Sequence, residues 1–239
     1  MALETYDDPS DLYLARGPEV NEHRPLFTGD VLGNVAVPDV QDTGMAMIIA
    51  HPCSMRGPEA KLNDVVLVAA AEPHSPVGPG AWTKGYFDTM PLPDLTPSGM
   101  HVARFSQLGT ARSADLSTPS RLACLSVYGV NLLQQRLIWY LTRFEVPTFR
   151  LQEAFAHTYE EADILEEWTG ILCEAGWATE DAAARFEAYI RATTGSGSSL
   201  QQDLRDPQRR PAVRLACRAE ARRLVREPRP NGDPPHGWS

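Results

Sequence analysis

Short apolar and alternating runs fill the first half of the chain, from Phe27 to about Ser113. The spacers between them, such as PHSPVGPGAW and PLPDLTPSG, have the composition of loops. Several short strands separated by Gly/Pro turns are typical of a small barrel or sandwich. The strands that the pattern predicts are Asp30–Val37, Met45–Ala50, Val65–Ala71, Tyr86–Met90 and His101–Leu108.

The second half of the chain has helical spacing. Ser117-Thr118-Pro119 is typical of a helix start, and apolar residues then recur every three or four positions over Ser120–Arg143. Pro147 ends this segment. Two further helices are predicted at Phe149–Cys173, which is acidic on one side, and from Thr179 to about Ala192.

The remaining segments differ in composition from these elements. Residues 1–26 have few apolar positions and predict a surface-wrapping or partly disordered arm. Residues 194–199 have the composition of a flexible linker, residues 200–226 that of a basic helix, and residues 227–239 that of a disordered tail.

Composition narrows the class of protein. The 239 residues can form one large domain or a domain with an appendage, and no apolar run approaches the length of a membrane span. The acidic N-terminus lacks the pattern of a secretory signal, so a cytoplasmic location is expected. The four cysteines are widely spaced and no glycine-rich nucleotide loop occurs, so we expect neither a metal nor a cofactor.

Charge is unevenly distributed along the chain. The net charge of −9 argues against broad nucleic-acid binding. Nevertheless, Arg205–Arg229 contains nine arginines and only three acidic residues. Two interpretations stay open: this segment pairs with phosphates, or it docks on the chain's own acidic helix.

The first candidate site is the loop that follows the Met45–Ala50 strand. It presents His51, Cys53, Ser54 and Arg56 within six residues, where they could act as base, nucleophile, substrate contact and anion clamp. The structural alternative is a turn with Cys53 buried, Ser54 capping backbone amides and Arg56 solvated. A zinc site that adds His74 to this loop matches no standard ligand spacing.

The second candidate site follows the next strand. Glu72 and His74 lie at its end, and His101 and Arg104 would join them and the first loop if the strands are neighbours in a barrel. Residues three apart on a strand face opposite sides, so at most one of His101 and Arg104 belongs to the site.

Two aromatic residues lie in the Gly/Pro-rich loop nearby. Trp82 and Tyr86 could stack on a base or line a substrate pocket. The alternative is that they anchor the long loop on the barrel.

The first 145 residues resemble the PemK/MazF family of toxin endoribonucleases. The resemblance rests on Gly29-Asp30-Val31, the buried runs MAMIIAH and DVVLVAAAE, and HVARFSQLGTARSADL followed by Leu125-Ser126 at a helix start. It implies an SH3-like barrel closed by a packing helix, and pairing of two copies through their barrels.

The sequence departs from this family at its catalytic positions. Thr43-Gly44 stands where the family has an arginine–proline pair, and Ala71-Glu72-Pro73-His74 stands where it has a proline followed by threonine and serine. Arg56 as electrostatic stabiliser and His74 as general acid/base could substitute at shifted positions.

Taken with this resemblance, the sequence predicts an α+β protein with an N-terminal SH3-like small β-barrel followed by a C-terminal helical region. The predicted divisions are an arm (1–26), the barrel with its packing helix (27–145), a helical extension (146–193), the linker (194–199), the basic helix (200–226) and the tail (227–239).

Three functions stay open. The favoured one is a binding or interaction module for a protein or RNA, on a barrel whose catalytic motif has degenerated, with a homodimer formed by the apolar Leu122–Leu141 surface. The second is an endoribonuclease of a bacterial toxin–antitoxin or defence system. The third is a small-molecule enzyme that depends on Cys53. None of them requires a cofactor or a membrane.

Overall fold

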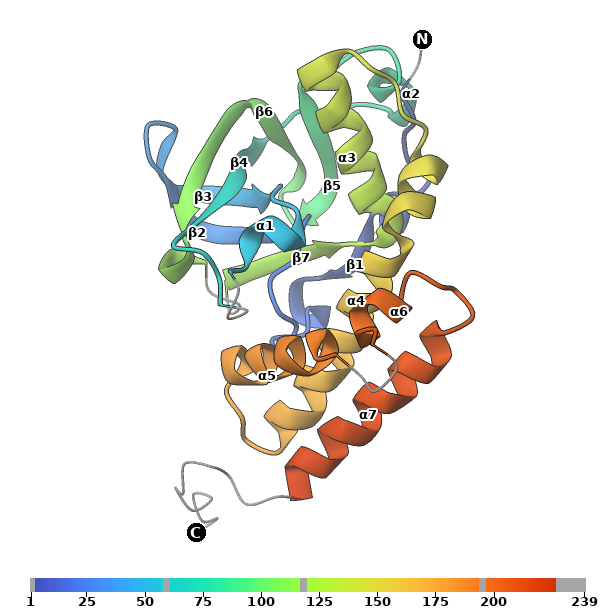
Figure 1. Cartoon of the computed structure of the whole chain (residues 1–239). Coiled ribbons are helices and arrows are strands. Elements are labelled where there is room, and N and C mark those ends of the chain that lie inside the picture. Colours follow the sequence, from blue (N-terminus) through green and yellow to red (C-terminus); the bar gives the residue numbers. More distant parts are fainter. Residues whose placement is uncertain (1–2, 58–60, 117–119, 194–196, 227–239) are drawn as a thin grey trace. The chain divides into compact units, whose positions relative to one another are not determined.

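A computed structural model describes residues 3–57, 61–116, 120–193 and 197–226 (Figure 1). The chain divides into two compact units, and the division falls within one long helix. Unit 1 comprises Met1–Glu22, Leu26–Gly57 and Leu62–Phe155; unit 2 comprises His23–Pro25, Pro58–Lys61 and Ala156–Ser239.

Unit 1 is built on a seven-stranded antiparallel sheet with the order β1-β7-β2-β3-β4-β6-β5. Among the described residues no strand pairing joins β1 to β5, so the closed barrel that we predicted is not confirmed, whereas the mixture of strands and helices is. The strands are β1 (Tyr13–Arg16), β2 (Val31–Val37), β3 (Gln41–Ile48), β4 (Val65–Pro73), β5 (Thr89–Thr96), β6 (Gly99–Arg112) and β7 (Arg121–Leu125).

Unit 1 also contains helices, and unit 2 is helical. Within unit 1 they are η1 (Pro9–Leu12), η2 (Gly17–Glu19), α1 (Pro52–Met55), α2 (Pro79–Trp82), η3 (Ser113–Asp115) and α3 (Val127–Thr142). Helix α4 (Thr148–Glu174) begins in unit 1, and α5 (Thr179–Arg191), α6 (Leu200–Asp203) and α7 (Arg210–Arg226) belong to unit 2. None of the described helices is long and apolar enough to cross a membrane.

The core of unit 1 follows from alternation along its strands. Val35 and Val37 on β2 pack in one cluster with Ile48 on β3 and with Val66 and Val68 on β4. This is the period-two burial expected of a sheet with one covered face.

Helix α3 packs closely against the N-terminal segment. Ser126 caps it by accepting a hydrogen bond from the Gly129 N–H at 3.1 Å. A side chain at Gly129 would collide with the Leu12 carbonyl, so only glycine allows this approach.

The N-terminal segment is part of the fold rather than a loose arm. Leu3, Tyr6 and Leu12 are buried, and β1 pairs with β7. The Glu4 carboxylate accepts the Thr148 N–H at 2.8 Å. The few apolar residues of this segment are therefore sufficient to anchor it, which argues against the partly disordered alternative that we considered for residues 1–26.

The helix predicted over Ser120–Arg143 begins later in the structure. Arg121–Leu125 forms β7, which pairs with β1 and β2, and α3 starts at Val127 after the Ser126 cap. Leu122 and Leu125 are three positions apart, which is a helical spacing, but the pairing partners on both sides favour the strand. The predicted start at residues 117–119 lies outside the described residues.

The spacer PLPDLTPSG also forms structure, because β5 occupies most of it. This strand lies at the edge of the sheet and pairs only with β6. An edge strand tolerates Pro91 and Pro93, since the missing N–H groups need no partner strand there. The predictions for β2, β4, α4 and α5 agree with the structure to within two residues.

Unit 2 has a helical core of its own. Trp168, Phe186, Leu204, Val213 and Cys217 are buried at its centre. The basic helix predicted over 200–226 is two helices, α6 and α7. Pro207 and Pro211 explain the break, because proline disfavours a helical residue before it but is accepted in a first turn.

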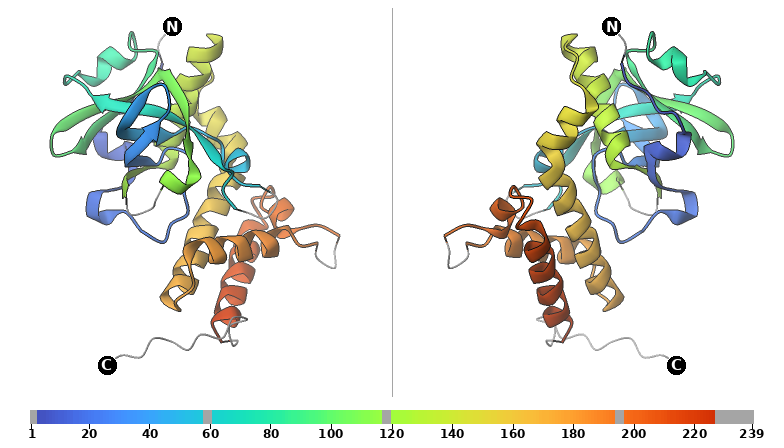
Figure 2. Two further views of the ribbon diagram at one scale, coloured as in Figure 1. Left: turned by 90° about the vertical axis from the view of Figure 1, so that its left-hand side faces the viewer. Right: turned by 90° about the vertical axis from the view of Figure 1, so that its right-hand side faces the viewer.

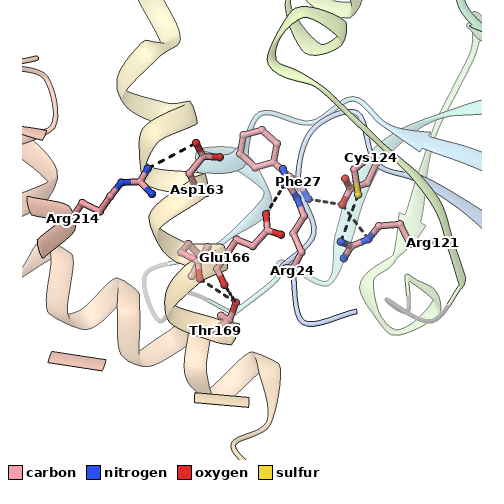
Figure 3. A network of polar contacts seen from close by, with 10 residues as sticks. Arg24, Phe27, Arg121, Cys124, Asp163, Glu166, Thr169 and Arg214 are labelled. Carbon is pink, nitrogen blue, oxygen red and sulfur yellow. Dashed lines mark hydrogen bonds and ion pairs between the residues drawn. The ribbon is translucent and has the colours of Figure 1, made fainter. Parts of the chain in front are cut away.

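Helix α7 lies beside the part of α4 that belongs to unit 2 (Figure 2), and ion pairs join the two helices. Arg214 donates to Glu160 at 2.8 Å, and Arg218 pairs with Glu167. Arg214 also lies 3.9 Å from Asp163, and Figure 3 shows this pair. The basic segment therefore docks on the chain's own acidic helix, one of the two interpretations that the sequence left open.

A separate ion pair lies in the interior of unit 1. Asp30 is buried between β2 and β7, 3.3 Å from the Arg121 guanidinium, and it accepts the Phe27 N–H at 3.0 Å. Removing either residue would leave the charge of the other buried without a partner, which is strongly destabilising. The pair therefore holds the start of β2 against β7.

Most of the apolar surface proposed for a homodimer is used within unit 1. Leu125, Val130 and Leu133 are buried there, whereas Leu141, at the end of this surface, is 63 % exposed. The structure holds one copy of the chain and leaves dimerisation a prediction of the sequence.

Candidate functional site

The two predicted loops lie at opposite ends of the sheet. Ile48 pairs with Val68 and Met45 with Ala71, because β3 and β4 are antiparallel. The chain after β3 therefore runs along the first half of β4, where the Ala50 N–H donates to Leu67 at 3.3 Å. His74 lies seven residues further along, which is about 20 Å on a strand. The convergence of the two loops that we expected does not form.

The first loop is a capped helical turn, α1. The Nδ1 atom of His51 accepts the Cys53 N–H at 3.3 Å, and the Ser54 hydroxyl donates to the His51 carbonyl at 2.8 Å. Met55 is the buried residue of the turn, while Cys53 is exposed and Arg56 half-buried. The turn of the structural alternative forms, but its other features do not: Cys53 is exposed, Ser54 donates to a carbonyl instead of capping an amide, and Arg56 is not fully solvated.

At the other end of the sheet the structure gathers three aromatic rings, His74, Trp82 and Tyr86, which we call the aromatic site. The centroid of the Tyr86 ring lies 5.5 Å from that of His74, nearly perpendicular to it, and 4.8 Å from that of Trp82. Trp82 is completely buried, so it supports the other two rings from below. Trp82 therefore anchors the loop, as one interpretation predicted.

An ion pair lies beside the aromatic site. The Arg104 Nε atom is 2.5 Å from the Glu72 Oε1 atom. Glu72 precedes His74 by two residues, and Arg104 is opposite Thr89, which bonds to Tyr86. This pairing neutralises the charge of Arg104, one of the residues predicted for the second candidate site.

His101 does not reach the surface at this site. It is buried, and its Nδ1 atom lies 3.1 Å from the Gly99 carbonyl oxygen. Arg104, three residues further along β6, is partly exposed. The structure thus places Arg104 at the aromatic site and His101 in the interior.

Tyr86 has an unusual backbone. Its φ angle is +54°, in the left-handed region that bulky residues rarely adopt, and 42 % of the residue is exposed. Its carbonyl oxygen accepts hydrogen bonds from Arg136 Nη2 at 2.7 Å and from Thr89 Oγ1 at 2.9 Å. A conformation of this kind persists where its surroundings over-determine it, as they do here.

Arg136 on α3 is the functional residue that our sequence analysis missed. Its guanidinium is fully buried and donates to the carbonyl oxygens of Thr89 at 2.7 Å, Tyr86 at 2.7 Å and Trp82 at 3.2 Å. Burial lowers the pKa of this guanidinium to about 10, partly opposed by Asp88, so it stays charged at neutral pH. A single cation in the run LLQQRLIWYL was the available signal.

The aromatic site is suited to stacking rather than to proton or metal chemistry. It presents an exposed ring on a rigid support beside a neutralised ion pair. In the part of the chain that the structure describes, no three His, Cys, Asp or Glu residues are grouped to hold a metal ion. The zinc site of His51, Cys53 and His74 is not assembled, because the strands separate them.

Comparison with known proteins gives no relative from which to transfer a function. No family model matches the chain, and no curated protein matches it. The interpretation of the aromatic site therefore depends on its own geometry.

Proposed function

We propose that unit 1 is a binding module on an SH3-like barrel of the PemK/MazF type, and that it binds a protein partner through the aromatic site. The barrel is supported by contacts between its two edge strands. The Tyr13 hydroxyl on β1 donates to the Pro93 carbonyl on β5 at 2.8 Å, and Arg16 Nη1 donates to the Asp94 carbonyl at 3.0 Å.

The observation that carries the proposal is the presentation of Tyr86. A tyrosine in a left-handed conformation costs about 1–2 kcal/mol relative to an ordinary backbone. Arg136 holds that conformation from the interior and leaves the ring exposed. A buried cation that fixes a strained, exposed ring favours a function for the ring at the surface.

The charges near the ring favour a protein over RNA. Glu72 neutralises Arg104, and the chain carries a net charge of −9, so phosphates would meet little positive potential. An exposed aromatic ring on a rigid support suits an apolar ring, such as a proline or an aromatic side chain of an extended peptide.

The separation of the two loops favours binding over catalysis. The endoribonuclease hypothesis combined Arg56 with His74, but these residues follow opposite ends of paired antiparallel strands. A general acid must come within hydrogen-bond reach of the reacting atoms that the other residue stabilises.

Two substitutions of Tyr86 distinguish the contribution of its ring to binding from the cost of its strained backbone to stability. We expect Tyr86→Gly to be about 1 kcal/mol more stable than Tyr86→Ala, since only glycine adopts a positive φ without cost. Both variants should lose binding to peptides selected from a display library against the natural chain. Urea unfolding and fluorescence titration of those peptides measure the two effects.

Asn34→Gly is the matched control for this experiment. Asn34 also has a positive φ, +58°, but lies on β2, which β3 separates from β4 in the sheet, so this variant should keep full binding. Retention of binding by Tyr86→Gly would contradict the proposal. So would growth arrest with RNA cleavage on expression in bacteria, if Arg56→Ala with His74→Ala abolished it.

A further inference from the structure

We infer that unit 2 carries a second binding site, an exposed stripe of α7 that binds an acidic amphipathic helix of a partner protein. The stripe consists of Leu215, Ala219, Arg222 and Arg226, and we call it the α7 stripe. It belongs to a different unit from the aromatic site, and the inference does not depend on the proposed function of unit 1.

Helical geometry places these four residues on one side of α7. They are spaced by four, three and four positions, which brings side chains onto one face of a helix. All four are exposed, and Leu215 is exposed to 65 %. The core of unit 2 takes the other side of the helix, through Val213, Cys217, Ala221 and Leu224.

The two arginines of the stripe differ from three others on α7, each of which pairs with a carboxylate. Arg214 pairs with Glu160 at 2.8 Å, Arg218 with Glu167, and Arg223 with Glu220 at 2.5 Å. Within the described residues, Arg222 and Arg226 have no carboxylate partner within 4 Å. Their positive charge is therefore available to a ligand.

A cavity of about 370 Å³ lies between these arginines and the end of α4. Ile171, Ala175 and Val225 give it an apolar wall. The turn after α4 satisfies helix carbonyls with its own backbone, since Trp177 donates to Leu172 at 3.0 Å and Gly176 donates to Cys173 at 2.8 Å. The guanidiniums are thus not required to cap that helix.

The spacing of the two guanidiniums and Leu215 indicates which kind of ligand fits the α7 stripe. Two guanidiniums one turn apart match carboxylates at positions i and i+4 of a facing helix. Leu215 lies eleven residues before Arg226, about 16 Å along the axis, and supplies an apolar contact for the same partner helix.

Fluorescence anisotropy with the full chain tests this inference. The probe is a labelled synthetic helix with two glutamates one turn apart and leucines on the same face. We expect it to bind the natural chain, and Arg222→Gln with Arg226→Gln to weaken binding tenfold or more, which is about 1.4 kcal/mol or more. Leu215→Ser should weaken binding by a smaller factor.

Arg205→Gln with Arg209→Gln is the matched control, because it removes the same charge from exposed arginines outside the stripe. It should leave the affinity within twofold of the natural value, about 0.4 kcal/mol. Equal loss in the control, equal binding of a glutamine version of the probe, or tighter binding of single-stranded RNA would each overturn the inference. Circular dichroism of every variant separates lost binding from lost folding.

Discussion

Arg136→Met is expected to lower the free energy of unfolding of unit 1 by about 3–5 kcal/mol, the largest effect of any single substitution that we predict. Methionine fills most of the volume but leaves the carbonyl oxygens of Trp82, Tyr86 and Thr89 without the buried donor that the structure gives them. Urea unfolding followed by circular dichroism measures the change, and thermal unfolding should show a fall of about 10 °C.

The same helix supplies the control for this prediction. Arg143 ends α3 with a φ angle of +62° and is exposed, so Arg143→Gly removes an equal charge while relieving the backbone. We expect it to be neutral or stabilising by up to about 1 kcal/mol. If Arg136→Met proved as mild as Arg143→Gly, the buried guanidinium would not be what holds the 82–89 segment.

The secondary structure could be predicted where apolar periodicity was long or bounded by clear breakers. Helices α4 and α5 and strand β4 belong to this group. The errors occurred where a short segment acquired its conformation from a partner strand. Strand β7 is held by β1 and β2, and β5 uses the edge of the sheet to accommodate its prolines. Neither pairing is visible in a local pattern.

The candidate site could be predicted in part. Glu72, His74, Trp82, Tyr86 and Arg104 were all identified from the sequence, and the structure brings them together at one end of the sheet. The error was to add the 51–56 loop. Neighbouring strands were correctly expected, but antiparallel neighbours place successive strand ends at opposite edges.

The most important residue of the site lies far from it in the sequence. Arg136 is about fifty residues from Tyr86, and only the packing of α3 on the 82–89 segment brings the two together. A charged residue on an apolar helix face indicates that buried acceptors exist, but it does not say which segment supplies them. The strain at Tyr86 was equally invisible, because no local signal in the sequence marks a positive φ there.

Unit 2 contains a half-buried carboxylate, Glu161, whose ionisation opposes folding near neutral pH. Burial and, to a smaller extent, the nearby Glu187 carboxylate raise the pKa of Glu161 to about 7, and the Gln201 amide and Arg191 partly oppose them. Gln201 donates to Glu161 Oε1 at 3.0 Å, and Cys217 faces the same carboxylate from α7. Three other helices therefore surround the Glu161 side chain.

The sign of the pH dependence follows from this raised pKa. Between the ordinary value of 4.5 and about 7, the unfolded chain releases the proton while the folded chain retains it. Stability is therefore highest below the unfolded pKa and falls by up to about 3 kcal/mol as the pH rises through 7. Asp163, whose pKa burial also raises, acts in the same direction.

We expect Glu161→Gln to abolish most of this dependence and to stabilise unit 2 above about pH 7, since the amide matches the neutral carboxyl. Urea unfolding at about pH 5 and about pH 7.5, read by pulsed hydrogen exchange on peptides of α5 and α7, isolates unit 2 from unit 1.

Glu167→Gln is the control. Arg218 lowers the pKa of Glu167, so its contribution is lost only at more acidic pH and should not change across this window. A natural chain that is equally stable at both pH values would show that Glu161 is ionised at little cost, and the other three helices would then have to move apart to hydrate it.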